Sequence, residues 1–132
     1  MLGDLISESR GKRTVRRVLS SDPLKVEVSF EEAGKIMGAD YSGFGTYWSE
    51  VQPNGTLYGE GQGVYLTRDG EMVSWRGQGV GQIKAAGAVS YRGSLYYRTA
   101  SQKMSALNSQ VGVFEFEVDA EGNTQSKTWA WK

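Results

Sequence analysis

Glycine recurs at every second position over a long central stretch of this 132-residue chain, and that spacing constrains the fold most. Between residues 56 and 83 the glycines of Tyr58-Gly59-Glu60-Gly61-Gln62-Gly63 and of Arg76-Gly77-Gln78-Gly79-Val80-Gly81 fall on one side of a period-two pattern. A period of two is the repeat of a β-strand. Glycine inside a strand allows the sharp bends of a small barrel, so the spacing predicts curved antiparallel strands.

Turn signals divide the chain at regular intervals and leave little room for helix. They fall at Gly11-Lys12, Ser21-Asp22-Pro23, Pro53-Asn54-Gly55, Arg68-Asp69-Gly70, Ala86-Gly87 and Asp119 to Asn123. The segment 99–110 lacks strand character and is expected to form a short helix or a lid. The predicted strands lie near 4–10, 13–20, 24–33, 41–51, 56–67, 71–84, 88–98, 111–118 and 124–132, with a break near 34–38.

Neighbouring strands joined by tight turns pair with each other, and such a meander loses its free edges most simply by closing. We therefore predict an all-β, single-domain antiparallel up-and-down barrel of eight or nine strands that spans residues 1–132. A two-sheet β-sandwich is the alternative.

The Pro53-Asn54-Gly55 turn also predicts a register. A three-residue loop places Val51 opposite Leu57 and Trp48 opposite Glu60. If Arg68-Asp69-Gly70 turns in the same way, Glu60 lies opposite Gln78 and Gln62 opposite Arg76. A two-residue turn there would shift these pairs by one residue.

This register separates two faces of the central strands. One is glycine-rich and apolar, with Tyr47, Val51, Leu57, Tyr65, Val73, Trp75 and Ile83. The other is polar with aromatic residues, and its candidate ligand-binding residues are Trp48, Tyr58, Glu60, Gln62, Arg76 and Gln78. The simpler interpretation makes the polar face a solvated exterior, and the alternative turns it into the barrel.

Composition excludes many chemistries. The chain has no Cys and no His, which removes thiol nucleophiles, Cys/His zinc sites and imidazole proton shuttles. We expect no cofactor and no metal. Fifteen basic and fifteen acidic residues balance, so neither nucleic acid nor a membrane is an expected partner, despite the basic cluster of Lys12, Arg13, Arg16 and Arg17. The lack of a signal-like start and of disulfides predicts a cytoplasmic protein.

Three segments carry a resemblance: Gly55 to Thr67, Trp75 to Gly81 and Gly87 to Ser94. Their glycine spacing resembles that of allene-oxide-cyclase-like, or calycin-like, barrels. The whole chain, through Gly59 to Gly63 and Val111 to Asp119, is similar to a group of uncharacterised prokaryotic proteins. The cyclase resemblance implies an eight-stranded barrel, an apolar lumen and oligomers, and it transfers no catalytic residue.

Three functional hypotheses follow. The first is a non-catalytic barrel that binds a small, partly apolar ligand in its lumen, with segment 99–110 across one mouth. The second is a cofactor-independent isomerase or cyclase-like enzyme in which Glu60 and Arg76 act inside the barrel. The third is an interaction module that forms a homo-oligomer through exposed aromatic residues.

Overall fold

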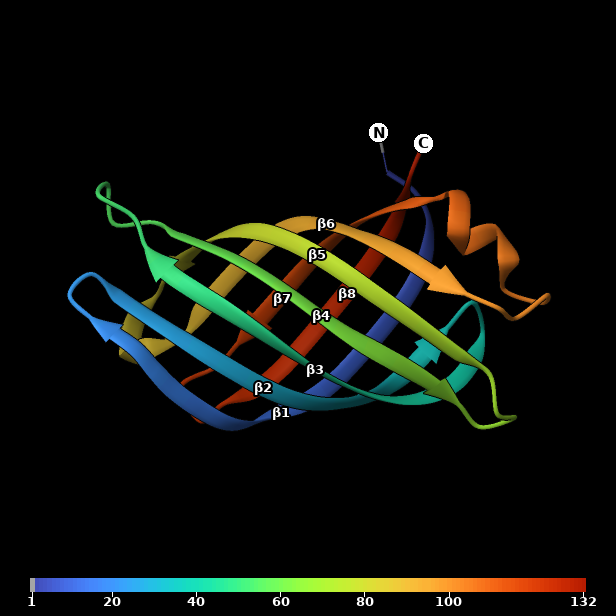
Figure 1. Ribbon diagram of the computed structural model, residues 1–132, viewed down its shortest axis with the longest axis horizontal. Helices are drawn as coiled ribbons and strands as arrows, with labels where there is room; N and C mark the ends of the chain where they lie inside the picture. Colours follow the sequence, from blue (N-terminus) through green and yellow to red (C-terminus); the bar gives the residue numbers. More distant parts are fainter. Residues whose placement is uncertain (1) are drawn as a thin grey trace.

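The computed structural model describes residues 2–132, and they form a closed barrel of eight antiparallel strands (Figure 1). Each strand pairs with its neighbours in sequence, and β1 closes the barrel by pairing with β8. The predicted up-and-down barrel is thus confirmed, with eight strands, and no second sheet is present among these residues. The strands are β1 (Leu2–Ser21), β2 (Leu24–Ile36), β3 (Ala39–Val51), β4 (Leu57–Thr67), β5 (Met72–Ile83), β6 (Val89–Thr99), β7 (Val111–Val118) and β8 (Asn123–Trp131).

One predicted turn is wrong. Gly11-Lys12 lies in the middle of β1, which runs unbroken for 20 residues and merges the two strands predicted at 4–10 and 13–20. Gly11 is a point of close approach, because a Cβ there would overlap the backbone of Glu31 on β2. The break predicted near 34–38 is a tight turn at Met37 and Gly38, between the ends of β2 and β3.

The predicted register of the central hairpins is confirmed. Val51 pairs with Leu57 and Trp48 with Glu60, and Glu60 pairs in turn with Gln78. Gly55 and Gly70 hold the left-handed backbone conformation, with φ of 87° and 92°, that three-residue hairpin loops place at their glycine.

The strands are steeply staggered around the barrel. From Gly11, the row of paired residues through β2 to β5 reaches Thr99 on β6. The row that starts from Gly11 in the other direction runs through β8 and β7 and reaches Val89 on β6. Val89 lies ten residues before Thr99, so the two rows do not meet at the same residue. Such a stagger tilts the strands and widens the interior enough for side chains or for one small ligand.

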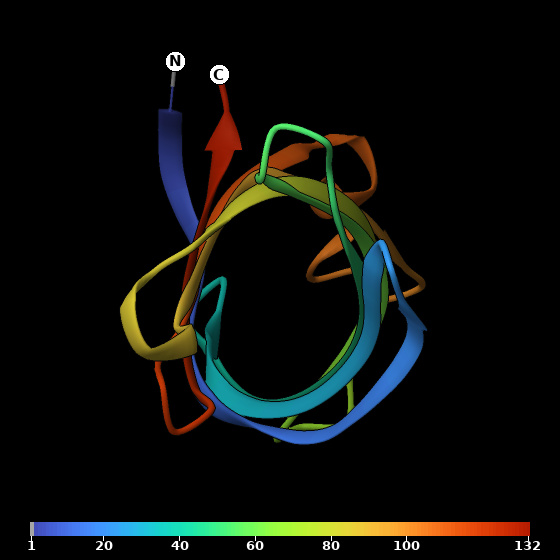
Figure 2. The same ribbon diagram turned by 90° about the vertical axis from the view of Figure 1, so that its left-hand side faces the viewer.

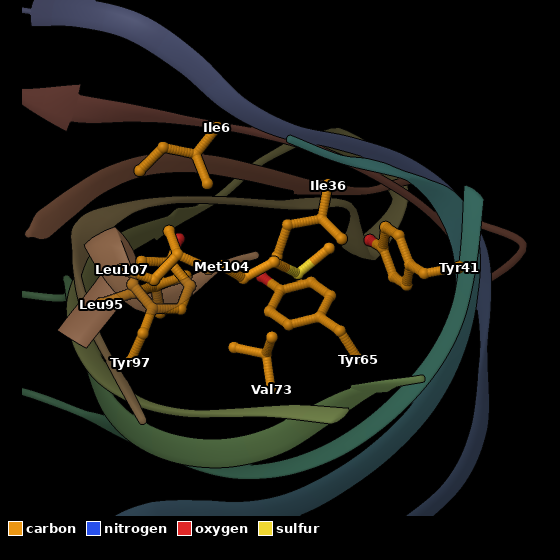
Figure 3. Close-up of a cluster of buried hydrophobic side chains, with 9 residues drawn as sticks. All are labelled: Ile6, Ile36, Tyr41, Tyr65, Val73, Leu95, Tyr97, Met104 and Leu107. Carbon is orange, nitrogen blue, oxygen red and sulfur yellow. The ribbon is translucent and has the colours of Figure 1, made fainter. Parts of the chain in front are cut away.

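Two hydrophobic clusters fill the two ends of this interior. The first, shown in Figure 3, contains Ile6, Ile36, Tyr41, Tyr65, Val73, Leu95, Tyr97, Met104 and Leu107. The second contains Phe30, Leu57, Tyr91, Phe116 and Val118. The glycine-rich face predicted from the register therefore lines the barrel, apart from the exposed Ile83 at the end of β5.

The segment between β6 and β7 closes one end of the barrel. Its short 3₁₀ helix η2 (Ser105–Ser109) carries Leu107, which is fully buried, and Met104 precedes it in the same cluster. The other short helix, η1 (Ala85–Gly87), connects β5 to β6 at the opposite end (Figures 1 and 2). The structure thus agrees with a cover formed by segment 99–110 at one mouth.

Candidate functional site

A cavity of about 80 Å³ lies in the barrel between the two clusters. Trp75 and Phe114 pack against both clusters and stay only partly buried, so they mark the middle of the interior. The inward-facing side chains around the cavity are mostly aromatic, with a few polar groups: Phe30, Glu32, Tyr47, Tyr65, Trp75, Tyr91, Leu95, Phe114, Phe116, Ser126 and Thr128. Four glycines of β4 and β5 and the exposed residues Glu60 and Gln78 between them complete its wall.

The glycines of the central strands give these rings their space. Gly63 pairs with Trp75, and a Cβ on Gly63 would lie 2.6 Å from the indole Nε1. Gly93 pairs with Phe114, and a Cβ there would lie 2.8 Å from that ring. Rings from neighbouring strands therefore occupy most of the volume that missing side chains leave, and the cavity is the part that they do not fill.

Glu32, on β2, is the acidic side chain that points into this cavity. Ser9 donates a hydrogen bond of 2.8 Å to its Oε1, and the Tyr41 hydroxyl donates one of 3.1 Å to its Oε2. Because the Ser9 proton is used in this way, the 2.8 Å contact between Ser9 and Ser126 has Ser126 as donor. A chain of hydroxyls from β8 and β1 thus holds the carboxyl group in place.

The charge of Glu32 is poorly compensated. Burial raises its pKa above the ordinary value, and the hydrogen bonds from Ser9 and Tyr41 only oppose part of this rise. No lysine or arginine in residues 2–132 forms an ion pair with it. A buried carboxyl group without a cation beside it is a common feature of binding and catalytic sites.

Tyrosine hydroxyls surround this carboxyl group on the side of the first cluster. Burial is the main cause that raises the pKa of Tyr41, Tyr65 and Tyr97, so all three stay protonated at neutral pH. The Tyr97 hydroxyl is buried without a hydrogen-bond partner in the described part of the chain. At the other end, Tyr91 donates a 2.6 Å hydrogen bond to Ser49.

The candidate residues from the sequence gather elsewhere, on the outside of the barrel. Trp48, Glu60, Gln62, Arg76 and Gln78 line a groove of about 430 Å³ across β3, β4 and β5. Tyr58 lies beside it and donates hydrogen bonds of 2.6 Å to Glu60 and 3.1 Å to Gln78. Ligand binding by these six residues stays a prediction, and the surface that they would offer to a ligand lies outside the barrel.

This placement corrects the enzyme hypothesis. Glu60 and Arg76 are both exposed, because the outward residues of β4 and β5 alternate with the glycines that face the lumen. They cannot act as an acid-base pair inside the barrel. The solvated outer face is the interpretation that the structure supports.

Sequence reasoning missed Glu32, although β2 carried a signal. Val26, Val28, Phe30, Gly34 and Ile36 alternate along the inward face of this strand, and Glu32 occupies the one remaining position of the series. An acid in an apolar stripe marks a buried carboxyl group. The neighbouring Glu31 obscured it, since two adjacent acids suggest a solvated turn or edge.

No helix in the described residues is long and apolar enough to cross a membrane. No protein-family model matches the sequence, and no curated protein matches it. The resemblance to allene-oxide-cyclase-like barrels therefore stays a prediction.

Solved structures nevertheless share the fold. A protein of unknown function from Clostridium acetobutylicum superposes with a TM-score of 0.84 at 11% identity, over 96% of each chain. A beta-barrel like protein from Acinetobacter baumannii gives 0.82 at 14% identity, over 100% of this chain and 96% of that one. An enzyme from Penicillium herquei gives 0.68 at 13% identity, over 96% and 92%. At these identities the similarity shows a shared fold and nothing about function.

Proposed function

We propose that this protein binds a small, partly apolar molecule inside the barrel, in the cavity beside Glu32. The observation that carries the proposal is a cavity walled by aromatic rings with the half-buried carboxyl group of Glu32 directed into it. Ligand sites combine mostly apolar walls with a few fixed polar groups in this way. Aromatic walls would hold the apolar part of the molecule, and Glu32 would fix its polar group.

The size of the cavity limits the molecule. An apolar cavity of about 150 Å³ holds benzene, so the roughly 80 Å³ here suit about three or four non-hydrogen atoms. A larger molecule would have to displace Trp75 or Phe114, the two central rings that are only partly buried.

The test is native mass spectrometry of the protein purified gently from its own cells. We expect a stoichiometric small adduct on the wild-type chain. Leu95→Phe adds volume to a buried wall of the cavity and should abolish the adduct, whereas Val80→Phe on the exposed face of β5 should keep it. Thermal unfolding of both variants checks that they fold. A bare wild-type monomer, or an adduct that persists in Leu95→Phe, would contradict the proposal.

The same experiment separates the other two hypotheses. Glu32, not Glu60, is the carboxyl group with which an isomerase or cyclase-like enzyme could move a proton inside the barrel. An enzyme would convert the recovered ligand into an isomer of equal mass and different chromatographic retention, whereas a binding protein would release it unchanged. A bare oligomer in the spectrum would favour the interaction module.

A further inference from the structure

The walls of the cavity have an unusual chemistry for so small a space. Seven aromatic rings line it, and of the two acids in its wall Glu32 lies on the inward face of β2, whereas Glu60 is exposed on the outer face of β4. The rings of Phe30, Tyr47 and Phe116 meet at angles between 53° and 82°, with centroids 5.4 to 6.0 Å apart. None of these three pairs stacks face to face. The faces of aromatic rings carry partial negative charge.

The carboxyl group adds full negative charge to the same space when it is ionised. Each Glu32 oxygen accepts one hydrogen bond and so keeps a further lone pair for a ligand. Its neighbours Ser9 and Tyr41 are neutral donors, and no cation in residues 2–132 pairs with it. A ligand that brought a positive charge would supply the missing partner.

We propose that the ligand is a small alkylammonium cation, held by Glu32 and by the surrounding aromatic rings. Aromatic rings together with a carboxylate form the cage that recognises methylated ammonium groups. An ammonium nitrogen that carries three methyl groups has four non-hydrogen atoms, which matches the size of the cavity. This inference rests on the proposed function and adds the chemical class of the ligand.

Two arginines lie nearer the mouth at the second cluster. Arg13 pairs with Phe30 and Arg16 with Val28. Because both partners face inward, the two arginines lie on the face of β1 that is turned toward the lumen. Neither lines the cavity. Their position makes a small organic anion the competing class, and the test includes one.

The experiment is a titration followed by NMR at pH 7.5 and constant ionic strength. The probes are trimethylammonium chloride, neutral 2-propanol and sodium acetate, whose organic components each have four non-hydrogen atoms and differ in charge. The indole N–H signal of Trp75 reports the cavity, and that of Trp48 on the outer face is the internal control. We expect trimethylammonium to shift the Trp75 signal with at least tenfold higher affinity than either other probe.

Variants then assign the cause. Glu32→Gln should weaken trimethylammonium binding at least tenfold and leave the binding of 2-propanol unchanged. Glu31→Gln, which removes the exposed carboxyl group next to Glu32 on the outer face of β2, should change neither. If Glu32→Gln does not fold, Phe116→Leu replaces it, because loss of one ring should weaken the cation selectively.

The outcomes separate this inference from the proposed function. Equal or tighter binding of 2-propanol or acetate in the cavity would overturn the cation and leave lumenal binding standing. Undiminished trimethylammonium binding by the folded Glu32→Gln variant would also overturn the cation. No shift of Trp75 with any probe would overturn both.

Discussion

Glu32 shows how one residue can be costly to the fold and useful to the site. Its carboxyl group lies among aromatic side chains, where burial disfavours the charged form, and only the hydroxyls of Ser9 and Tyr41 support it. Replacing such a group by an apolar residue would remove this cost. That the chain has an acid here is consistent with a role in the cavity.

The raised pKa of Glu32 makes stability depend on pH. Between the ordinary pKa of a glutamate and the higher folded value, the folded state holds a proton that the unfolded state has lost. The free energy of unfolding should therefore fall as pH rises through this window. Tyr41, Tyr65 and Tyr97, the titratable groups that face Glu32, stay neutral throughout it.

Urea unfolding from pH 4 to pH 8 measures this effect. We expect wild-type protein to lose stability relative to Glu32→Gln as pH rises, by about 1.4 kcal/mol for each unit by which the folded pKa of Glu32 exceeds its ordinary value. Parallel curves for wild type and Glu32→Gln would show that the carboxyl group is not perturbed by burial.

At the scale of the strand, glycines and aromatic residues act in pairs. Gly93 faces the lumen opposite Gly79, and the ring of Phe114 lies over it. A side chain at Gly93 would overlap the backbone of β5 as well as this ring. The glycines that alternate along β4, β5 and β6 therefore bring the strands together and let large rings fill a narrow barrel.

Gly93→Ala tests this packing. The added Cβ would overlap the carbonyl oxygen of Gln78 and approach the Phe114 ring, so we expect a loss of about 2 kcal/mol or more of unfolding free energy. Gly3→Ala is the matched control, because its Cβ would meet Ala130 only at 3.1 Å, near the end of the chain. Equal stabilities of the two variants, measured by urea unfolding, would argue against the packing role.

The strands and their registers were easier to predict from the sequence than the side-chain contacts inside the lumen. The loops at Pro53-Asn54-Gly55 and Arg68-Asp69-Gly70 determine their registers locally, through a left-handed glycine, and both registers are confirmed. Gly11 looked like another turn because a glycine at a close approach and one in a turn have the same local sequence signal. Glu32 contacts Ser9 and Tyr41 only in the folded barrel. The period-two pattern of β2 therefore indicates that Glu32 faces inward, but it does not indicate which residues donate hydrogen bonds to it.

The barrel as a whole depends on the pairing of its first and last strands. Leu2 pairs with Trp131 and Ser9 with Ser126, so the two ends of the chain lie side by side (Figures 1 and 2). This seam also holds Ser9 against Glu32, and the candidate site therefore requires closure. Adjacent ends and exposed turns are the conditions under which a chain tolerates circular permutation.

We therefore predict that a permuted chain, with its ends joined by a short flexible linker and reopened between Asn54 and Gly55, folds to the same barrel. These turn residues are exposed, and opening the chain there breaks no strand, so the cost should be about 1 to 2 kcal/mol. Reopening between Gly77 and Gln78 interrupts β5 beside the cavity and should unfold the protein or cost far more. Circular dichroism and urea unfolding compare the two. Equal stabilities of the two permuted chains would contradict this prediction, because they would show that the cavity wall does not require an unbroken β5.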